Sequence, residues 1–251
     1  MNHKIKIETK CWERDWEILL KTNRIQKMVE YNCYPFSNIS LLINNVKNID
    51  KVKLYADKLI EKSIISEYIV VDDYAKETLD FFNLSKKQLG IGYFYSIAEL
   101  VGIYLSKEDF ILHFSSDTFL KEKVDWIDKA IPYLDKKNKV ANLSWNNKFD
   151  EAKNESISEN DDFYYSYGFS DQMYLIRTED FKKQIYNQKH VDSDRYPKYG
   201  GELFEKRIDS WLRNNQYCRL TYKHSSYFHK NFPSSKIAIN IKLLTGTFHV
   251  K

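Results

Sequence analysis

The chain has 251 residues, of which 43% are hydrophobic and 29% are charged, and its formal net charge is +4. This composition is typical of a globular protein with one well-buried domain and excludes a disordered chain. The small net charge gives no reason to expect a nucleic-acid partner, although it suits phosphate-bearing substrates.

The first half of the chain alternates between predicted strands and helices. Apolar or alternating runs predict strands at 4–9, 39–43, 68–71 and 110–114. Helical spacing of apolar residues predicts helices at 15–30, with Asp15 as N-cap, at 51–63 and at 95–105. Another helical stretch follows Asp73 and ends at about residue 82. This order implies a mainly parallel sheet with helices on both faces, in which ligands bind at the carboxyl ends of the strands.

The second half of the chain is less regular. Strands are expected at 140–144, 172–176 and 220–222, and helices at 179–186 and 202–214. Residues 148–162 are acidic with few apolar members and are interpreted as a mobile surface loop, and 189–201 as another loop. No element is predicted beyond Phe232. Because there is neither an internal repeat nor a linker, a single domain spanning 1–251 is expected.

A carboxylate follows the most apolar predicted strand. Phe110–Phe114 leads directly into Ser115, Ser116 and Asp117. A hard divalent cation takes oxygen ligands, usually one or two carboxylates together with phosphate oxygens of a substrate. Asp117 is therefore a candidate metal and diphosphate ligand. The alternative is that it caps the next turn, since Ser-Asp-Thr is also good turn-forming chemistry.

At this point the chain resembles the GT-A glycosyltransferases, particularly the bacterial enzymes grouped around glycosyltransferase family 2. In that family the fourth strand ends in an Asp-x-Asp-like motif that holds the metal and the nucleotide diphosphate. Ser115-Ser116-Asp117 stands at that place and keeps only the last carboxylate. The resemblance implies that Ser116 and Asp117 contact the diphosphate. It also implies a divalent cation, Mn²⁺ or Mg²⁺, at a weaker site than two carboxylates would form.

Other strand ends follow the order of the same family. Thr9 and Lys10 resemble the first strand end and the loop around the nucleotide, Asn44 the second strand end and Asp73 the third. The resemblance implies that these residues bind the nucleotide sugar. The alternative is that Asn and Asp at strand ends form turns. The resemblance covers roughly residues 4–222, and it is more convincing in the first half.

The family's catalytic base is an acid near the start of a late helix. Glu205 matches the second acid of the family's pair, and Glu202 lies three residues earlier on the same face of the predicted helix, which follows Gly200 and Gly201. Both remain candidates, and ordinary helix capping is the alternative. Asp171, after the acidic segment, is a third candidate for the base or for acceptor binding, and a simple turn before a strand is equally compatible with it.

A late histidine completes the metal or diphosphate site in some enzymes of this fold. His224 and His229 flank an aromatic stretch near the end of the chain, and His224 is the better candidate as a metal ligand. Packing beside tyrosines is the more common role of such a histidine.

The resemblance implies a hexosyltransferase, of the inverting type, that uses a UDP- or GDP-type sugar and a glycan or lipid-linked acceptor in bacterial surface polysaccharide synthesis. Residues 1–120 would form the nucleotide-sugar half and 121–251 the acceptor half. The alternatives are a nucleotidyltransferase, which usually has a glycine-rich loop after the first strand, and a non-catalytic carbohydrate-binding protein.

The apolar pattern and the cysteines favour a cytoplasmic location. No apolar stretch approaches transmembrane length, and the first ten residues have no continuous hydrophobic region. Cys11, Cys33 and Cys218 lie far apart, so neither a zinc site nor a disulfide framework is expected. A lipid-linked acceptor would add a peripheral contact with the inner face of the cell membrane.

Overall fold

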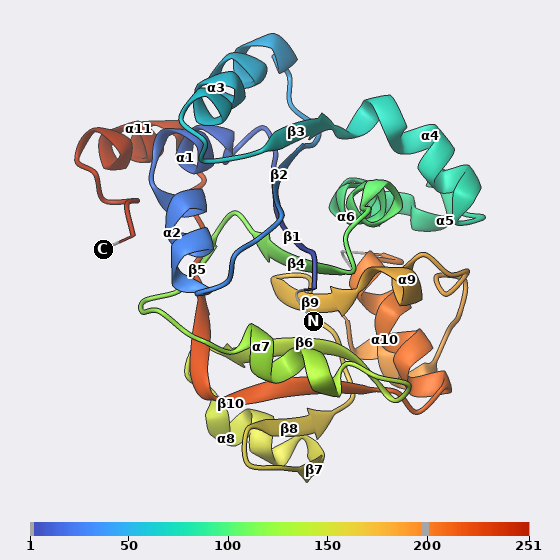
Figure 1. Ribbon diagram of the computed structural model, residues 1–251. Helices are drawn as coiled ribbons and strands as arrows, with labels where there is room; N and C mark the ends of the chain where they lie inside the picture. Colours follow the sequence, from blue (N-terminus) through green and yellow to red (C-terminus); the bar gives the residue numbers. More distant parts are fainter. Residues whose placement is uncertain (1–2, 197–200, 251) are drawn as a thin grey trace.

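The computed structural model describes residues 3–196 and 201–250, and its strands form one mixed sheet (Figure 1). The order of the strands is β3-β2-β1-β4-β9-β6-β10-β8-β7, and β5 pairs with β10 at the side. The strands are β1 (Ile5–Cys11), β2 (Asn38–Ile43), β3 (Glu67–Val70), β4 (Phe110–Ser115), β5 (Thr118–Phe119), β6 (Asn138–Trp145), β7 (Ser156–Glu159), β8 (Phe163–Ser166), β9 (Met173–Arg177) and β10 (Cys218–His229).

Helices cover both faces of this sheet. Figure 1 shows α4, α6 and α10 on one side and α1, α2 and α3 on the other. The helices are α1 (Trp16–Lys21), α2 (Arg24–Tyr31), α3 (Ile49–Glu61), α4 (Val71–Phe81), α5 (Lys86–Leu89), α6 (Tyr93–Leu105), α7 (Ile127–Ala130), α8 (Phe149–Asn154), α9 (Thr178–Phe181), α10 (Phe204–Asn214) and α11 (Lys236–Leu244). In the described part of the chain, none of them combines the length and the apolar character that crossing a bilayer requires.

The expected single α/β domain is confirmed, and its parallel part follows the predicted alternation. β3, β2, β1 and β4 are parallel neighbours, whereas β9 pairs antiparallel with both β4 and β6. In the register, Cys11 lies opposite Ile43, and Lys10 lies opposite Ser115. The carboxyl ends of β1, β2 and β4 therefore meet at one edge of the sheet.

The second half differs more from the expectation. The acidic segment 148–162 is not a loop, because it forms α8 and then β7, which pairs with β8 as the outer strand of the sheet. An edge strand exposed to water does not need the apolar residues that mark a buried strand. β10 runs to His229, well beyond the predicted strand end at 222, and α11 forms in the tail that carried no prediction.

Two predicted helices have different boundaries. The expected helix at 15–30 is divided into α1 and α2 at Thr22 and Asn23, and Asp15 makes no side-chain capping bond to it. The expected helix at 179–186 is limited to the four residues of α9.

A buried ion pair lies where α6 crosses β1. Lys6 Nζ is 2.7 Å from Glu8 Oε2, and His113 Nδ1 is 3.2 Å from Glu8 Oε1. Lys6 Nζ also donates to the carbonyl oxygen of Gly102 at 2.8 Å. A Cβ atom on Gly102 would lie only 2.6 Å from both carboxylate oxygens of Glu8. The absence of a side chain at this position therefore allows the helix to approach the strand.

We expect Gly102→Ala to lower the free energy of unfolding by about 1–3 kcal/mol, the usual effect of overpacking a core. Glu8 cannot move aside without breaking its contacts with Lys6 and His113. Urea denaturation of both proteins measures the difference. On an open helix face the same change would raise stability by up to about 1 kcal/mol, so an increase would contradict this reading of the contact.

Candidate active site

A cavity of about 600 Å³ lies at the carboxyl ends of β1, β2 and β4. The start of α6 and the residues just before β9 and at the end of β10 complete its walls. Of the residues predicted from the sequence, five line it, and they are Lys10, Asn44, Ser116, Asp117 and Asp171. Residues from both halves of the chain thus share one cavity.

Aromatic and amide side chains form the part of the cavity next to β1 and β2. Trp12, Phe94 and Tyr95 line it together with Asn44. The Asn44 side chain donates to the carbonyl oxygen of Phe94 at 2.7 Å, and its backbone N–H donates to that of Cys11 at 2.9 Å. These bonds fix the end of β2 against the start of α6 and the end of β1. Exposed aromatic faces beside a fixed amide are suited to stacking and orienting a flat ring.

Lys10 carries a positive charge into the centre of the cavity. Its Nζ pairs with the buried carboxylate of Glu99 on α6 and lies 4.0 Å from Asp171 Oδ2. Burial lowers the pKa of Lys10, but Glu99 and Asp171 outweigh burial and raise it above its usual value. The lysine is therefore ionised at any physiological pH, and the carboxylates of Glu99 and Asp171 fix its position at the cavity wall.

The exit of β4 carries a carboxylate and an imidazole in contact. Asp117 Oδ2 lies 3.0 Å from His229 Nε2, and both side chains line the cavity. The hydrogen bond to Asp117 raises the pKa of His229, and burial opposes that effect. The residue before Asp117, Ser116, donates its hydroxyl to the buried carboxylate of Asp15. The turn after β4 is therefore fixed from two sides.

Asp15 stands at the N-cap position of α1, as the sequence predicts, but its side chain makes no capping bond and is part of the cavity wall. It accepts hydrogen bonds from the Trp12 N–H at 2.8 Å and from the Ser116 hydroxyl. Burial raises its pKa from 3.8 to about 7, against the effect of these bonds. The carboxyl thus takes up a proton more readily in the folded chain than in the unfolded one.

We expect Asp15→Asn to remove a pH dependence of stability. Because the pKa of Asp15 is raised in the folded state, its protonation favours folding below about pH 4. This contribution to the free energy of unfolding, up to about 4 kcal/mol, is lost as the pH rises to about 7. Urea denaturation between pH 4 and pH 8 measures the slope. The difference in unfolding free energy between parent and variant should change over this interval, with exposed Asp73→Asn as the control. A constant difference would show that Asp15 titrates normally.

Three predicted ligands lie away from the cavity. Thr9 is 1% exposed inside the sheet, because β1 continues two residues further, to Cys11. Asp73 is exposed on the first turn of α4, which begins directly after β3. His224 is exposed and pairs with Asp162 at 3.3 Å, because β10 extends five residues beyond it. His229, the less favoured histidine, is the one beside Asp117.

The three candidate bases lie in different surroundings. Asp171 lines the cavity, and its backbone N–H donates to Glu205 Oε1 at 3.2 Å. Burial and the charge of Asp171 raise the pKa of Glu205 well above its usual value. Glu202 precedes α10 instead of lying on it, and its carboxylate pairs with Lys206 at 2.9 Å, outside the cavity. Gly200, one of the two glycines before the predicted helix, lies outside the described residues.

The donor atoms fit a cation that is shared with a substrate. Among residues 3–196 and 201–250, no three His, Cys, Asp or Glu side chains are grouped as a metal site. Asp117 and His229 offer one carboxylate and one imidazole, side by side in an open cavity. Such a partial set suits a divalent ion that takes its other ligands from phosphate oxygens and water. Asp117 and His229 are therefore the residues that would hold it.

Some residues of the site were not selected from the sequence. Glu99 is the only charged residue of α6, and an isolated acid in an apolar helix is a signal that could have identified it. The sequence predicts Asp15 only as a cap, and it gives no signal for Arg24, which donates to the carbonyl oxygens of Ser116 and Thr118.

Comparisons with known proteins agree on the fold. No family model and no curated protein matches the chain. Among solved structures, GalNAc-T7 with UDP, GalNAc and Mn²⁺ superposes with a TM-score of 0.57 at 11% identity, over 92% of this chain and 44% of that one. The structure of glucosyl-3-phosphoglycerate synthase from Mycobacterium tuberculosis contains Mn²⁺, UDP and phosphoglyceric acid. It superposes with a TM-score of 0.51 at 11% identity, over 98% of this chain and 79% of that one.

A third similar structure is S. aureus TarS, with a TM-score of 0.50 at 10% identity over 91% of this chain. This chain spans 44% of the GalNAc-T7 chain and 37% of the TarS chain. At these identities the likeness shows a shared fold, the GT-A fold of nucleotide-sugar glycosyltransferases.

Proposed function

We propose that this chain is a glycosyltransferase that moves a hexose from a UDP- or GDP-type sugar to a hydroxyl of a glycan or lipid-linked acceptor. The observation that carries the proposal is the Asp117–His229 pair in the cavity at the carboxyl ends of β1, β2 and β4. In α/β sheets ligands bind at this edge. The GT-A neighbours with UDP and Mn²⁺ support the choice of ligand.

The two ends of the donor would contact different parts of the cavity. Trp12 and Asn44 are placed to contact the base and ribose, and Ser116 and Asp117 to orient the diphosphate. Lys10 supplies a positive charge between them. When bound by Asp117 and His229, a Mn²⁺ or Mg²⁺ ion would neutralise charge on the leaving diphosphate. In this arrangement residues 1–120 form most of the donor side.

Transfer also requires a carboxylate that accepts the proton of the acceptor hydroxyl. We assign this role to Asp171, which lines the same cavity and whose backbone is held by Glu205. As the hydroxyl oxygen attacks the anomeric carbon, its proton passes to Asp171, and the bond from that carbon to the diphosphate oxygen breaks. Attack opposite the leaving group gives inversion. Most of the acceptor side would then come from residues 121–251. We propose that the transfer serves bacterial surface polysaccharide synthesis.

We expect UDP-sugars or GDP-sugars to bind more tightly with Mn²⁺ than without it. Calorimetry with UDP-, GDP- and CDP-sugars measures this, and free Mn²⁺ alone should bind weakly, because two protein ligands do not complete its coordination. A nucleotidyltransferase would instead prefer a nucleoside triphosphate, and a carbohydrate-binding protein would bind free sugar alone. If no nucleotide sugar binds at millimolar concentration, the proposed function is wrong.

A further inference from the structure

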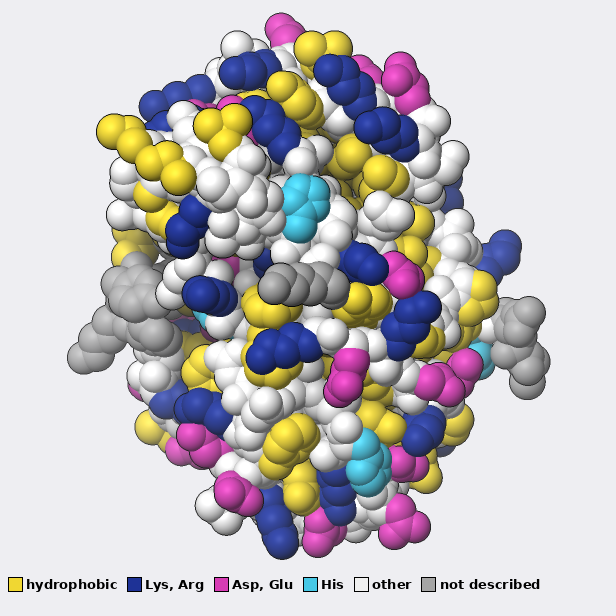
Figure 2. Space-filling view, turned by 90° about the vertical axis from the view of Figure 1, so that its left-hand side faces the viewer, with side chains coloured by type: hydrophobic (Ala, Val, Ile, Leu, Met, Phe, Trp, Pro, Cys, Tyr) yellow, Lys and Arg dark blue, Asp and Glu magenta, His cyan; other side chains and the backbone are white. Residues whose placement is uncertain are grey.

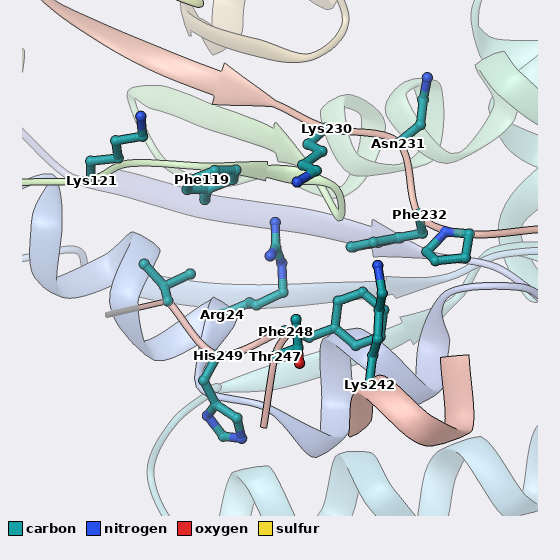
Figure 3. Close-up of a pocket in the computed structure, with 12 residues that line it drawn as sticks. Arg24, Phe119, Lys121, Lys230, Asn231, Phe232, Lys242, Thr247, Phe248 and His249 are labelled. Carbon is teal, nitrogen blue, oxygen red and sulfur yellow. The ribbon is translucent and has the colours of Figure 1, made fainter. Parts of the chain in front are cut away.

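A second cavity of about 600 Å³ lies beside the active site, between the end of β10, the start of α2 and the segment after α11 (Figure 3). Its basic side chains are Arg24, Lys121, Lys230 and Lys242, and aromatic rings including Phe119 and Phe232 form its walls. None of the described residues that line it is acidic. We call it the basic cavity.

Arg24 is the innermost cation of the basic cavity and is only 6% exposed. Its Nε and Nη2 donate to the carbonyl oxygens of Ser116 and Thr118, at 3.0 and 3.2 Å. Burial lowers its pKa to about 10, and the charges of Asp117 and Asp15 on its other side oppose this effect. The guanidinium is thus fixed in place, ionised at neutral pH and poorly solvated.

Lys230 and Lys242 point into the same space as Arg24 (Figure 3). Within the described ranges, neither lysine forms an ion pair with a carboxylate. The ammonium groups of Lys121 and Lys242 lie over aromatic rings instead, 3.7 Å from the centroid of Phe228 and 5.9 Å from that of Phe248. Asp117 and Asp15 lie near Arg24 but do not line this cavity, so on the cavity side the like charges of Arg24 and the lysines repel one another. A bound anion would replace this repulsion between the cations with attraction to itself.

The number of charges favours a phosphate over a carboxylate. A carboxylate brings one negative charge, whereas a phosphate monoester carries about −1.5 to −2 and offers three strong acceptor oxygens. Three or four cations can satisfy that charge and those oxygens. The rings of Phe119 and Phe232, whose centroids lie 5.3 and 5.1 Å from the guanidinium carbon of Arg24, would pack against an apolar part of the same ligand.

The basic cavity adjoins the active site through shared residues. Asn231 lines both cavities. Lys230 follows His229 directly, and its backbone N–H donates to the carbonyl oxygen of Asp117 at 3.2 Å. Arg24 holds the carbonyl of Ser116 from the other side of the same turn. A phosphate in the basic cavity would therefore sit next to the reacting sugar without occupying the donor's place.

An apolar stripe on α11 lies close to the basic cavity, since Lys242 of that helix lines it. Ile237, Ile241 and Leu244 follow helical spacing and are 73%, 56% and 88% exposed. Figure 2 faces the side of the molecule that carries α11 and shows basic side chains interspersed with hydrophobic ones. Apolar and basic side chains on one surface match a ligand that is both phosphorylated and apolar.

We propose that the basic cavity binds the phosphate group of an acceptor whose adjoining part is apolar. That this ligand is an acceptor rests on the proposed glycosyl transfer, whereas the phosphate site itself does not. The phosphate can belong to a soluble ester or to a lipid headgroup, and the chemistry of recognition is the same for both.

Calorimetry with hexyl phosphate, and with hexanol as the uncharged probe, tests the site. We expect hexyl phosphate to bind, hexanol to bind far more weakly, and Lys230→Gln/Lys242→Gln to weaken the phosphate by about 10-fold or more. The control variant Lys76→Gln/Lys87→Gln makes the same change of net charge on exposed α4 and α5 residues and should keep parental affinity. Equal affinity in both variants, or no binding of hexyl phosphate, would overturn the proposal.

Vesicles separate the two sources of the phosphate. Flotation with phosphatidylcholine vesicles, with and without phosphatidic acid, is compared for the parent, Leu244→Ser and the Lys230→Gln/Lys242→Gln variant. For a lipid headgroup, binding needs phosphatidic acid and is lost in both variants, although Leu244→Ser still binds hexyl phosphate. For a soluble ester, no vesicle binding occurs and the hexyl phosphate result stands. Binding of UDP with Mn²⁺ to the parent tests the proposed function by itself. It should be unchanged in both variants, and its loss in Lys230→Gln/Lys242→Gln would show that the basic cavity holds the donor, which would overturn the separate phosphate site.

Discussion

Asp117→Asn is expected to lower turnover by about 10²–10³-fold, the size of effect seen when one preorganised charge-stabilising group is lost. The substitution removes the charge at constant size, and the asparagine oxygen can still accept from His229, so the fold should be retained. Donor affinity with Mn²⁺ should fall, whereas affinity without metal should change little. Steady-state kinetics and calorimetry on the same preparation measure the two effects.

Asp73→Asn is the matched control for this experiment. It makes the same chemical change at an exposed carboxylate on α4, outside the cavity. Its turnover should equal that of the parent. Parental turnover of Asp117→Asn would show that the aspartate only shapes the turn after β4, and the assigned role of the Asp117–His229 pair would be wrong.

Asp171→Asn is expected to lower turnover by about 10²–10⁴-fold, the usual loss when a general base is removed. Asp171 is the candidate base that lines the cavity, so its carboxylate can reach an acceptor hydroxyl there. Donor affinity and the melting temperature should stay close to parental values, because the side chain is replaced at equal size. Kinetics, calorimetry and thermal denaturation of one variant separate these outcomes.

Two further variants decide between the candidate bases. Glu205→Gln keeps an oxygen that can accept from the Asp171 N–H and should cost less than Asp171→Asn. Glu202→Gln loses only the pair with Lys206 and should remain near parental turnover. A large loss of turnover in Glu205→Gln, with little change in Asp171→Asn, would show that Glu205 is the base.

The parallel half of the fold could be predicted because its signals are local. Apolar runs such as Phe110–Phe114 are buried strands, and the first polar residues after them lie at one edge of the sheet. That relation between strand ends and the ligand edge placed Lys10, Asn44 and Asp117 in one cavity. It did not place Asp73, because α4 follows β3 without a loop.

The contacts of the second half depend on tertiary structure. His229 and Asp117 are 112 positions apart in the chain. They meet only because β10 runs to residue 229 and pairs there with β5. A register shift between Tyr222 and Ser226 changes which side chains face which side of that strand. No periodicity in the sequence encodes this shift, so the choice of His224 over His229 followed from position alone.

The most direct test of the Asp117–His229 metal site is a crystal structure of the protein with UDP and Mn²⁺, with anomalous scattering used to locate the manganese. We expect one manganese peak within about 2.5 Å of a carboxylate oxygen of Asp117, with His229 adjacent and the diphosphate in the cavity at the ends of β1, β2 and β4. Manganese and UDP bound at another place, or a cavity that stays empty at saturating ligand, would show that this cavity is not the donor site.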